Sequence, residues 1–425
     1  MLRTGRTDMA ACQYGAGCPK SAKCRLPVAC HSRRLCAIHL LALGDKPRYD
    51  DSMAITLTSL LHLDALGFDD IIDVRAPAEY AEDHIPGAIN LPVLDDAQRA
   101  EVGTIYKQDS PFLARKLGAA LVARNAAGHL EGALRDRPGG WRPLIYCWRG
   151  GQRSGSFASI LAQIGWRVET IAGGYKAWRK LVSDALYDAA PPVPVILLDG
   201  NTGTAKTEVL NLLPAIGVQV IDLEGLANHR GSLFGAMGPQ PSQKAFEGAL
   251  AMALARLDPA RPVVLEAESI RIGNLYLPPK LYGAMQAAPR FAIEAPLAAR
   301  AQYLVTAYGD LIADPARLQD VISQLRPMHP AAQIAEWQQM AVAGDHRALA
   351  AGLMEQHYDP RYAKHRGKVT VPVRQVAGAG LGQAGLEQAG LSQAGLQAIA
   401  AQIARQIAPH EGFGAVPGQG IVAES

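Results

Sequence analysis

The feature that most constrains the fold is a short apolar run that ends in a cysteine and a glycine-rich loop. The run Pro143-Leu144-Ile145-Tyr146 predicts a short buried strand, and Cys147 follows it directly. Two consecutive glycines then allow a tight turn before a helical pattern opens at Arg153-Ser154. A strand that runs through a loop into a helix is the repeating unit of α/β proteins with a parallel sheet.

This loop is suited to bind an anion, because the N–H groups of the loop and of the helix N-terminus point towards its centre. These dipoles, together with Arg149 and Arg153, predict a lowered pKa for the thiol of Cys147 and a thiolate near neutral pH. A buried, inert cysteine is the alternative, which the surrounding glycines and arginines disfavour. The residues expected to contact the anion are Trp148, Arg149, Gly150, Gly151, Gln152 and Arg153.

Composition describes a folded protein with no membrane-spanning segment. Of the 425 residues, 49% are hydrophobic and 19% charged, and no apolar run reaches the length of a membrane span. A net charge of +3 neither requires nor excludes a nucleic-acid partner. Five of the six cysteines lie in the first 36 residues, which leaves Cys147 alone in the rest of the chain. One cysteine in a reactive loop fits a reducing compartment, so we expect a cytoplasmic protein.

Residues 1–52 differ in character from the remainder of the chain. Their cysteines recur every six residues without a Cys-x-x-Cys pair or apolar periodicity, a spacing that disfavours a metal site. We expect a disordered or non-native extension, with Met53 as a natural start, and no metal site anywhere in the chain.

Residues 53–188 are expected to form a first α/β domain. Predicted strands at 70–74 and 167–171, and a turn with a further strand within 84–92, alternate with helical patterns and join the strand before Cys147 in a parallel sheet. The proline-rich stretch 189–194 marks the boundary to a second domain, at 193–370.

The second domain opens with a fully apolar strand, Val195–Asp199, that runs into a glycine-rich loop and a helix. The loop, Gly200–Thr207, nearly matches a Walker A motif (P-loop), with Ala205 in place of the usual second glycine. Loop N–H groups and one lysine charge favour a polyphosphate. The expected diphosphate-binding residues are Gly200, Gly203, Thr204, Lys206 and Thr207.

Polar loops come after two further strands of this domain, on the rim where open α/β sheets bind ligands. The second of these strands ends in Glu266 and Glu268, which suit either a magnesium-bound water or a hydrogen bond that organises the neighbouring loops. The residues predicted to contact RNA or phosphate are Lys107, His229, Arg230 and Arg271.

The chain is expected to end in a helical region and a tail. Residues 297–354 are helical by pattern, with Arg300, Tyr303, Arg326 and His329 expected mostly on solvated faces. Residues 371–425 are expected to be a low-complexity tail with a five-residue Ala-Gly-Leu repeat, and a short amphipathic helix is compatible with 396–407.

Ordered motifs in the first domain resemble the rhodanese signatures. They are Asp73-Val74-Arg75, Glu79-Tyr80, His84-Ile85-Pro86-Gly87-Ala88, the Cys147 loop and Gly173-Gly174-Tyr175-x-x-Trp178. The Cys-x5-Arg spacing is one residue longer than in many simple sulfurtransferases and equals that of rhodanese-related phosphatases. A wider loop suits a tetrahedral oxyanion such as phosphate or a selenium-bearing phosphate.

A rhodanese domain N-terminal to a P-loop domain is similar to the tRNA 2-selenouridine synthase family. The stretches that carry the resemblance are 102–108, 147–154, 222–235 and 264–273. The resemblance implies a transferase that replaces the sulfur of 2-thiouridine at the tRNA wobble position (U34) by selenium. Selenophosphate would be the selenium donor, and an S-geranyl intermediate would form from geranyl diphosphate.

In this interpretation Cys147 is catalytic, its loop binds selenophosphate, and the P-loop binds geranyl diphosphate or a nucleotide. The expected partners are tRNA, through an anticodon loop that bears 2-thiouridine, and an enzyme that supplies selenophosphate. We expect no tightly bound cofactor, and the need for Mg²⁺ stays open, as does a covalent perselenide on the cysteine.

Four other functions stay open. They are a persulfide sulfurtransferase fused to a nucleotide-binding P-loop domain, a Cys-x5-Arg phosphatase, a small-molecule kinase, and a non-catalytic RNA-binding adaptor. For the adaptor, Cys147→Ser would leave function intact.

Overall fold

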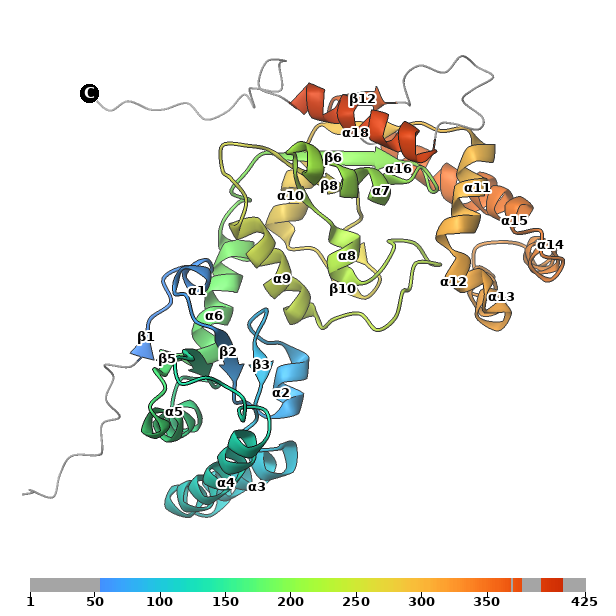
Figure 1. Cartoon of the computed structure of the whole chain (residues 1–425). Coiled ribbons are helices and arrows are strands. Elements are labelled where there is room, and N and C mark those ends of the chain that lie inside the picture. Colours follow the sequence, from blue (N-terminus) through green and yellow to red (C-terminus); the bar gives the residue numbers. More distant parts are fainter. Residues whose placement is uncertain (1–53, 368–369, 377–390, 408–425) are drawn as a thin grey trace, which may run out of the picture. The chain divides into compact units, whose positions relative to one another are not determined.

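The computed structural model describes residues 54–367, 370–376 and 391–407 (Figure 1). The extension predicted for 1–52, Met53 and most of the five-residue repeat lie outside these residues. The described part contains two five-stranded sheets whose paired strands are all parallel, which confirms the α/β class expected from sequence.

The first sheet has the strand order β1-β5-β4-β2-β3. These strands are β1 (Ala54–Ile55), β5 (Glu169–Ile171), β4 (Pro143–Tyr146), β2 (Asp70–Asp73) and β3 (Ile89–Asn90). The helices around them are α1 (His62–Ala65), α2 (Pro77–Glu82), α3 (Asp96–Gln108), α4 (Pro111–Glu131), α5 (Gln152–Ile164) and α6 (Gly174–Ser183), which continues into the π-helical turn η2 (Asp184–Asp188). As the apolar run predicts, β4 is central and buried along its whole length.

Local sequence explains where the longer helices begin and end. α4 begins after Ser110, whose hydroxyl accepts hydrogen bonds from the N–H groups of Phe112 and Leu113. α5 ends at Gly165, which takes the left-handed conformation that stops a helix. Leu121 of α4 and Phe157 of α5 are buried in one apolar core with residues of strand β4. Cys147 belongs to the same core, which therefore anchors the start of its loop.

The second sheet has the order β12-β11-β6-β8-β7, with the P-loop strand β6 in the middle. Its strands are β12 (Val373–Val376), β11 (Arg290–Ile293), β6 (Val195–Gly200), β8 (Val263–Glu266) and β7 (Gln219–Ile221), and a separate antiparallel hairpin is formed by β9 (Arg271–Ile272) and β10 (Leu275–Tyr276). Its helices are α7 (Lys206–Leu212), α8 (Leu223–Ala227), α9 (Gln243–Ala255), α10 (Pro279–Ala287) and α18 (Gln393–Ile407), with a 3₁₀ turn η3 (Pro214–Ile216).

The helical region expected after residue 297 is present and has its own apolar core. It consists of α11 (Leu297–Ala307), α12 (Gly309–Ile312), α13 (Pro315–Ser323), α14 (Ala331–Val342), α15 (His346–Leu353), the π-helical turn η4 (Met354–Tyr358) and α16 (Asp359–Arg366). The expectation of solvated side chains is correct for Arg326, which is exposed, and wrong for Arg300, which is buried and ion-paired to Asp359.

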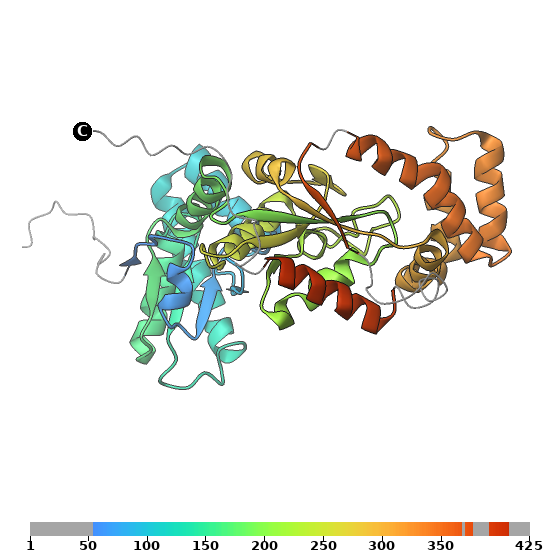
Figure 2. The ribbon, with the colours of Figure 1, turned by 90° about the horizontal axis from the view of Figure 1, so that it is seen from above.

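The expected low-complexity tail needs correction at two stretches. Strand β12 pairs with β11 over its full length, so the sheet extends past residue 370. Helix α18 buries Leu396, Ile399 and Ile403 in the core that also holds residues of α7, and Figure 2 shows it alongside this sheet. The apolar spacing predicts the helix, but the glycine-rich repeat before it gives no sign that the helix belongs to the second domain.

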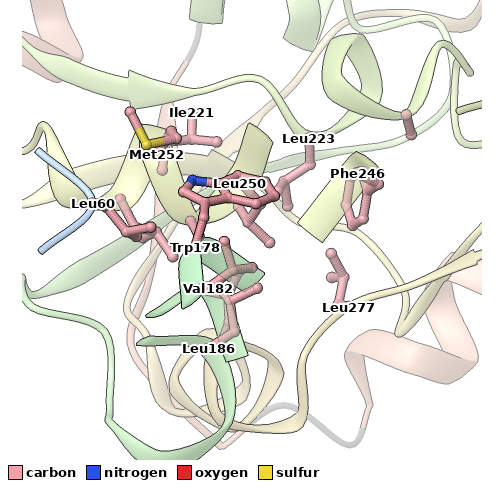
Figure 3. Close-up of a cluster of buried hydrophobic side chains, with 14 of the residues drawn as sticks. Leu60, Trp178, Val182, Leu186, Ile221, Leu223, Phe246, Leu250, Met252 and Leu277 are labelled. Carbon is pink, nitrogen blue, oxygen red and sulfur yellow. The ribbon is translucent and has the colours of Figure 1, made fainter. Parts of the chain in front are cut away.

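The two domains share a hydrophobic core (Figure 3). Trp178 of α6 is fully buried among Phe246 and Leu250 of α9. A Cβ at Gly248 would lie 2.7 Å from the Trp178 ring, so only glycine allows this close approach. Arg179 forms an ion pair with Glu247 at the edge of the core. The proline-rich stretch 189–194 therefore separates the two domains in the sequence, while their hydrophobic cores are continuous.

Candidate functional site

The loop after β4 holds Cys147 in a nearly closed environment. The side chain is only 4% exposed. Its Sγ accepts hydrogen bonds from the backbone N–H of Gly151 and from the hydroxyl of Ser154, both at 3.3 Å. Both donors belong to the start of α5, so the sulfur faces the helix N-terminus as the sequence predicts.

These contacts favour the thiolate. Burial raises the pKa of the Cys147 thiol, but the hydrogen bonds from Ser154 and Gly151 and the charge of Arg153 lower it by more. The net pKa is below that of a free cysteine, as expected. The Ser154 hydroxyl is the strongest of these favourable contacts, a role that the sequence alone does not assign to it.

Arg153 is held by a partner that sequence spacing does not reveal. Its Nη1 donates to Glu79 Oε2 of α2 at 2.7 Å, and Arg99 lies 3.9 Å from the same oxygen. Burial raises the pKa of Glu79, but the contacts with Arg153 and Arg99 lower it by more. The net pKa is below the ordinary value, so the group is a carboxylate. An ionised Glu79 cannot protonate a leaving group, so this residue is not the general acid that a phosphatase needs.

The rest of the loop is held by the turn before α6. Gly150 has φ 62°, and a Cβ there would lie 2.3 Å from the carbonyl oxygen of Ile171. Trp148 stacks on Tyr175 with ring centroids 5.2 Å apart, so in this structure its ring packs the loop. Arg149, Gly151 and Gln152 are exposed at the loop's outer side, where an incoming anion would meet them.

The P-loop joins β6 to α7 through three residues with positive φ. Gly200 has φ 155° and Gly203 has φ 84°. A Cβ at Gly203 would lie 2.9 Å from the carbonyl oxygen of Arg300. Ala205 has φ 57°, so the residue that replaces the second Walker glycine keeps a conformation that favours glycine.

The side chains of Thr204, Lys206 and Thr207 form hydrogen bonds within the P-loop or to Glu224 of α8. Lys206 Nζ donates to the carbonyl oxygen of Gly200 at 3.1 Å, and Thr204 Oγ1 donates to that of Asn201. Thr207 Oγ1 donates to Glu224 Oε2 at 3.1 Å. Burial lowers the pKa of Lys206, but nearby groups, among them Glu224, raise it by more and keep the ammonium charged.

Two acidic groups, Glu224 of helix α8 and Glu268 of the loop after β8, meet beside Lys206. Glu268 shares a hydrogen bond with Glu224, and burial followed by the charge of Glu224 raises the pKa of Glu268 to about 8. Glu266 instead lies in β8 with no exposed surface and accepts a hydrogen bond from the N–H of Leu223 at 3.1 Å. Of the two roles open for Glu266, the structure contains the hydrogen bond that organises the neighbouring loop.

The P-loop borders a cavity of about 540 Å³, here called the P-loop cavity. Polar groups of its lining are contributed by the P-loop, Asp222, Glu224, Arg230, Ser232, Glu268, Ser269 and Arg361. The apolar and aromatic residues of its lining are Met237, Tyr303, Leu304, Ala307, Tyr308, Tyr358 and Tyr362. Such a cavity fits a ligand with an anionic end and an uncharged remainder.

Of the four residues predicted to contact RNA or phosphate, Arg230 lines the P-loop cavity and the other three lie elsewhere. Arg230 lines the cavity, pairs with Asp310 at 3.0 Å and lies over the ring of Tyr308. His229 instead accepts a hydrogen bond from the N–H of Gly231 through Nδ1, and burial lowers its pKa. Arg271 is exposed in the β9–β10 hairpin, where it donates to the carbonyl oxygen of Gly273. Lys107 is exposed in the last turn of α3.

Within residues 54–367, 370–376 and 391–407, no group of three or more His, Cys, Asp or Glu is placed to hold a metal ion. No helix in the described ranges has both the length and the apolar character needed to cross a membrane.

Comparison with known proteins gives the family. Residues 57–181 match the rhodanese-like domain, and residues 193–325 match the AAA domain of tRNA 2-selenouridine synthase. A tRNA 2-selenouridine synthase of Pseudomonas syringae pv. tomato is 33% identical over 337 residues, which cover 71% of this chain and 90% of that protein. One from Shewanella denitrificans is 39% identical over 252 residues, covering 56% of this chain and 65% of that protein.

Among solved structures, the N-terminal domain of a Clostridium difficile 630 protein is 38% identical, covers 30% of this chain and 98% of its own, and gives a TM-score of 0.26. The match to the Pseudomonas relative covers nearly the whole length of that protein. The chain therefore belongs to the tRNA 2-selenouridine synthase family.

Proposed function

We propose that this protein replaces the sulfur of 2-thiouridine at the wobble position of tRNA by selenium, in two steps at two sites. The observation that carries the proposal is the presence, on one chain, of a loop that stabilises a thiolate and of a P-loop cavity whose lining includes apolar and aromatic residues. Family membership supplies the RNA substrate. A sulfurtransferase alone would need only the first of these sites.

The first step is transfer of a geranyl group in the P-loop cavity. The sulfur of 2-thiouridine attacks C1 of geranyl diphosphate, a C–S bond forms, the C–O bond breaks, and diphosphate leaves. The base loses its N3 proton to water. The P-loop amides and Lys206 hold the leaving diphosphate, whose growing charge they stabilise.

Two features favour a prenyl diphosphate over a nucleotide in this cavity. The lining includes Leu304, Met237 and several tyrosine rings, which suit a hydrocarbon chain. Binding a diphosphate as a leaving group requires no residue that orients a hydrolytic water.

The second step takes place at the Cys147 loop, which holds selenophosphate. Selenium attacks C2 of the S-geranylated base, the C2–S bond breaks, and geranyl thiol leaves. Water then cleaves the P–Se bond to give phosphate, and N3 regains its proton. The loop's exposed arginine, Arg149, meets the phosphoryl oxygens, while the Cys147 thiolate accepts the proton of a protonated selenium and so leaves the selenium as the stronger nucleophile.

The cellular compartment and a partner enzyme follow from this proposed chemistry. A free thiolate needs a reducing compartment, and the tRNA substrate is met in the cytoplasm. An enzyme that makes selenophosphate would supply the donor, which is reactive enough to favour direct delivery.

Mass spectrometry of an anticodon stem-loop bearing 2-thiouridine tests the proposal. We expect a geranyl mass gain with geranyl diphosphate alone, lost in Lys206→Ala, and selenium in place of sulfur once selenophosphate is added, lost in Cys147→Ser. A stem-loop with ordinary uridine is the control and should gain neither. RNA that binds the wild-type protein but gains no mass under any condition would refute the enzyme and favour an adaptor.

A further inference from the structure

Helices α3 and α4 of the first domain form an antiparallel hairpin. Asn125 of α4 donates to Gln98 Oε1 of α3 at 2.7 Å, and nearer the turn a Cβ at Gly118 would lie 3.5 Å from a methyl group of Val102. Figure 1 shows the two helices side by side. Residues 104–116, where α3 ends and α4 begins, are here called the hairpin tip.

Three large apolar side chains of the hairpin tip face solvent. Tyr106 is 55% exposed, Phe112 65% and Leu113 52%. Single exposed apolar residues are common on protein surfaces, but two aromatic rings and a leucine so close together form a patch. The buried residues of α4 are others, so this patch is not part of the core on which the fold depends.

The backbone of the hairpin tip is fixed by hydrogen bonds. The carbonyl oxygen of Ile105 accepts bonds from the N–H groups of Asp109 and Ser110, both at 3.0 Å. The Ser110 hydroxyl caps α4, and Pro111 occupies the first turn, where its restricted φ suits a helix. Rings carried by a fixed backbone lose little conformational entropy when a ligand stacks on them.

Cations surround the exposed rings. Lys107, Arg115 and Lys116 are exposed, and Asp109 is the one acidic residue in the sequence of the tip. The first turn of α4 contains no acidic residue. Positive charge beside aromatic faces is the combination that binds unpaired RNA, because cations contact phosphates while rings stack on bases.

A second copy of this chain fits the hairpin tip less well than RNA does. Two copies that paired through the same patch would each bring three cations into one interface, where like charges repel. The exposed parts of the three apolar side chains amount to about 300 Å². A stable protein interface buries about 800 Å² on each partner.

Helix α3 connects the hairpin tip to the Cys147 loop. Arg99 of α3 lies 3.9 Å from Glu79 Oε2, the oxygen that accepts a hydrogen bond from Arg153 of that loop. Tyr106 follows Arg99 by nearly two turns, so both lie on one face of α3, about 10 Å apart along its axis. This distance equals about three stacked nucleotides. Nucleotides close in sequence to a base at the Cys147 loop therefore have the tip within reach.

We propose that the hairpin tip binds the unpaired nucleotides that flank the wobble base in the anticodon loop. Tyr106 and Phe112 stack on bases, and Lys107, Arg115 and Lys116 contact phosphates. The inference rests on the proposed function for the identity of the RNA. It adds the surface that holds the loop while one base is presented to the chemistry.

The variants Phe112→Leu and Tyr106→Leu test the stacking contacts, because leucine is apolar and a good helix former but has no ring. Phe112→Tyr keeps a ring. Ile164→Ala, which shortens another exposed apolar side chain of the same domain, is the matched control. Binding of a fluorescent anticodon stem-loop that bears 2-thiouridine is measured by anisotropy over a series of salt concentrations, beside a fully paired RNA duplex of equal length.

We expect each leucine variant to weaken stem-loop binding by about fivefold or more, the effect of losing one base–ring stack. The dependence of affinity on salt should stay the same, because no charge is removed. Phe112→Tyr and Ile164→Ala should change stem-loop binding by less than about twofold. Duplex binding should change in none of the variants.

Unchanged stem-loop affinity in both leucine variants, or an equal loss for the duplex, would overturn the assignment. A wild-type dimer that Phe112→Leu converts to a monomer in sedimentation, with RNA binding unaffected, would overturn it in favour of self-association. Thermal unfolding confirms that the variants are folded.

Mass spectrometry of the modified RNA separates this inference from the proposed function. Wild-type protein that needs the rings for binding but adds neither geranyl nor selenium refutes the proposed function and leaves the RNA surface standing. Modification with an unchanged KM for RNA in both leucine variants refutes only the RNA surface.

Discussion

Replacing Ser154 by alanine should raise the pKa of the Cys147 thiol, because the Ser154 hydroxyl is the largest of the contacts that lower it. The Ser154 hydroxyl donates to Sγ at 3.3 Å, and both side chains are buried. A hydrogen bond to a charged group contributes about 1.5–3 kcal/mol, and one pKa unit corresponds to about 1.4 kcal/mol. Loss of the bond therefore removes stabilisation from the thiolate and not from the thiol.

The assay is the rate of Cys147 alkylation by iodoacetamide as a function of pH, measured by mass spectrometry of the peptide that contains it. Peptide-level detection separates Cys147 from the five cysteines near the N-terminus. The midpoint of the pH profile should move upward in Ser154→Ala and stay unchanged in Ser156→Ala, a partly buried serine of the same helix. A midpoint that does not move, in protein with an unchanged unfolding temperature, would refute the role of the hydroxyl.

The contacts support four further predictions. Glu268 has a pKa of about 8, so it is neutral below that pH and anionic above it; calorimetry should show diphosphate binding weakening as pH rises past 8, and Glu268→Gln should abolish this trend. Ala205→Gly should stabilise the protein by up to about 1 kcal/mol in urea unfolding, because Ala205 is in the left-handed region; a loss of stability would contradict this. Trp178→Ala should destabilise both domains by about 3–5 kcal/mol, since they share its core; unfolding that affects the first domain alone would be the contrary result. Lys107→Ala should weaken RNA binding equally across sequences and reduce its salt dependence by about one counterion, measured by fluorescence anisotropy; an unchanged salt slope would exclude a phosphate contact.

Much of the fold is readable from the sequence because its signals are local. The buried strands β4 and β6 are continuous apolar runs, and each leads through glycines into a helix. The conformations of Gly150 and Gly203 are set by the same turns. The resemblance to known families also rests on contiguous motifs, which is why the family and the α/β class agree with the structure and the comparisons.

The rest depends on contacts between residues far apart in the chain. Glu79 lies 74 positions before Arg153, and Asp359 lies 59 after Arg300. No periodicity links such pairs, and an arginine with a distant partner looks like a solvated one. The P-loop cavity has the same origin, because residues of α11 and α16 complete its lining and the pattern of each helix indicates only that it buries one face.

The division of labour between the two sites is the central claim, and a prepared intermediate tests it most directly. An anticodon stem-loop that already carries S-geranyl-2-thiouridine is incubated with selenophosphate and each variant, and selenium incorporation is measured by mass spectrometry. We expect Lys206→Ala to convert this RNA at nearly the wild-type rate and Cys147→Ala to leave it unchanged. Failure of Lys206→Ala, or full conversion by Cys147→Ala, would contradict the division of labour.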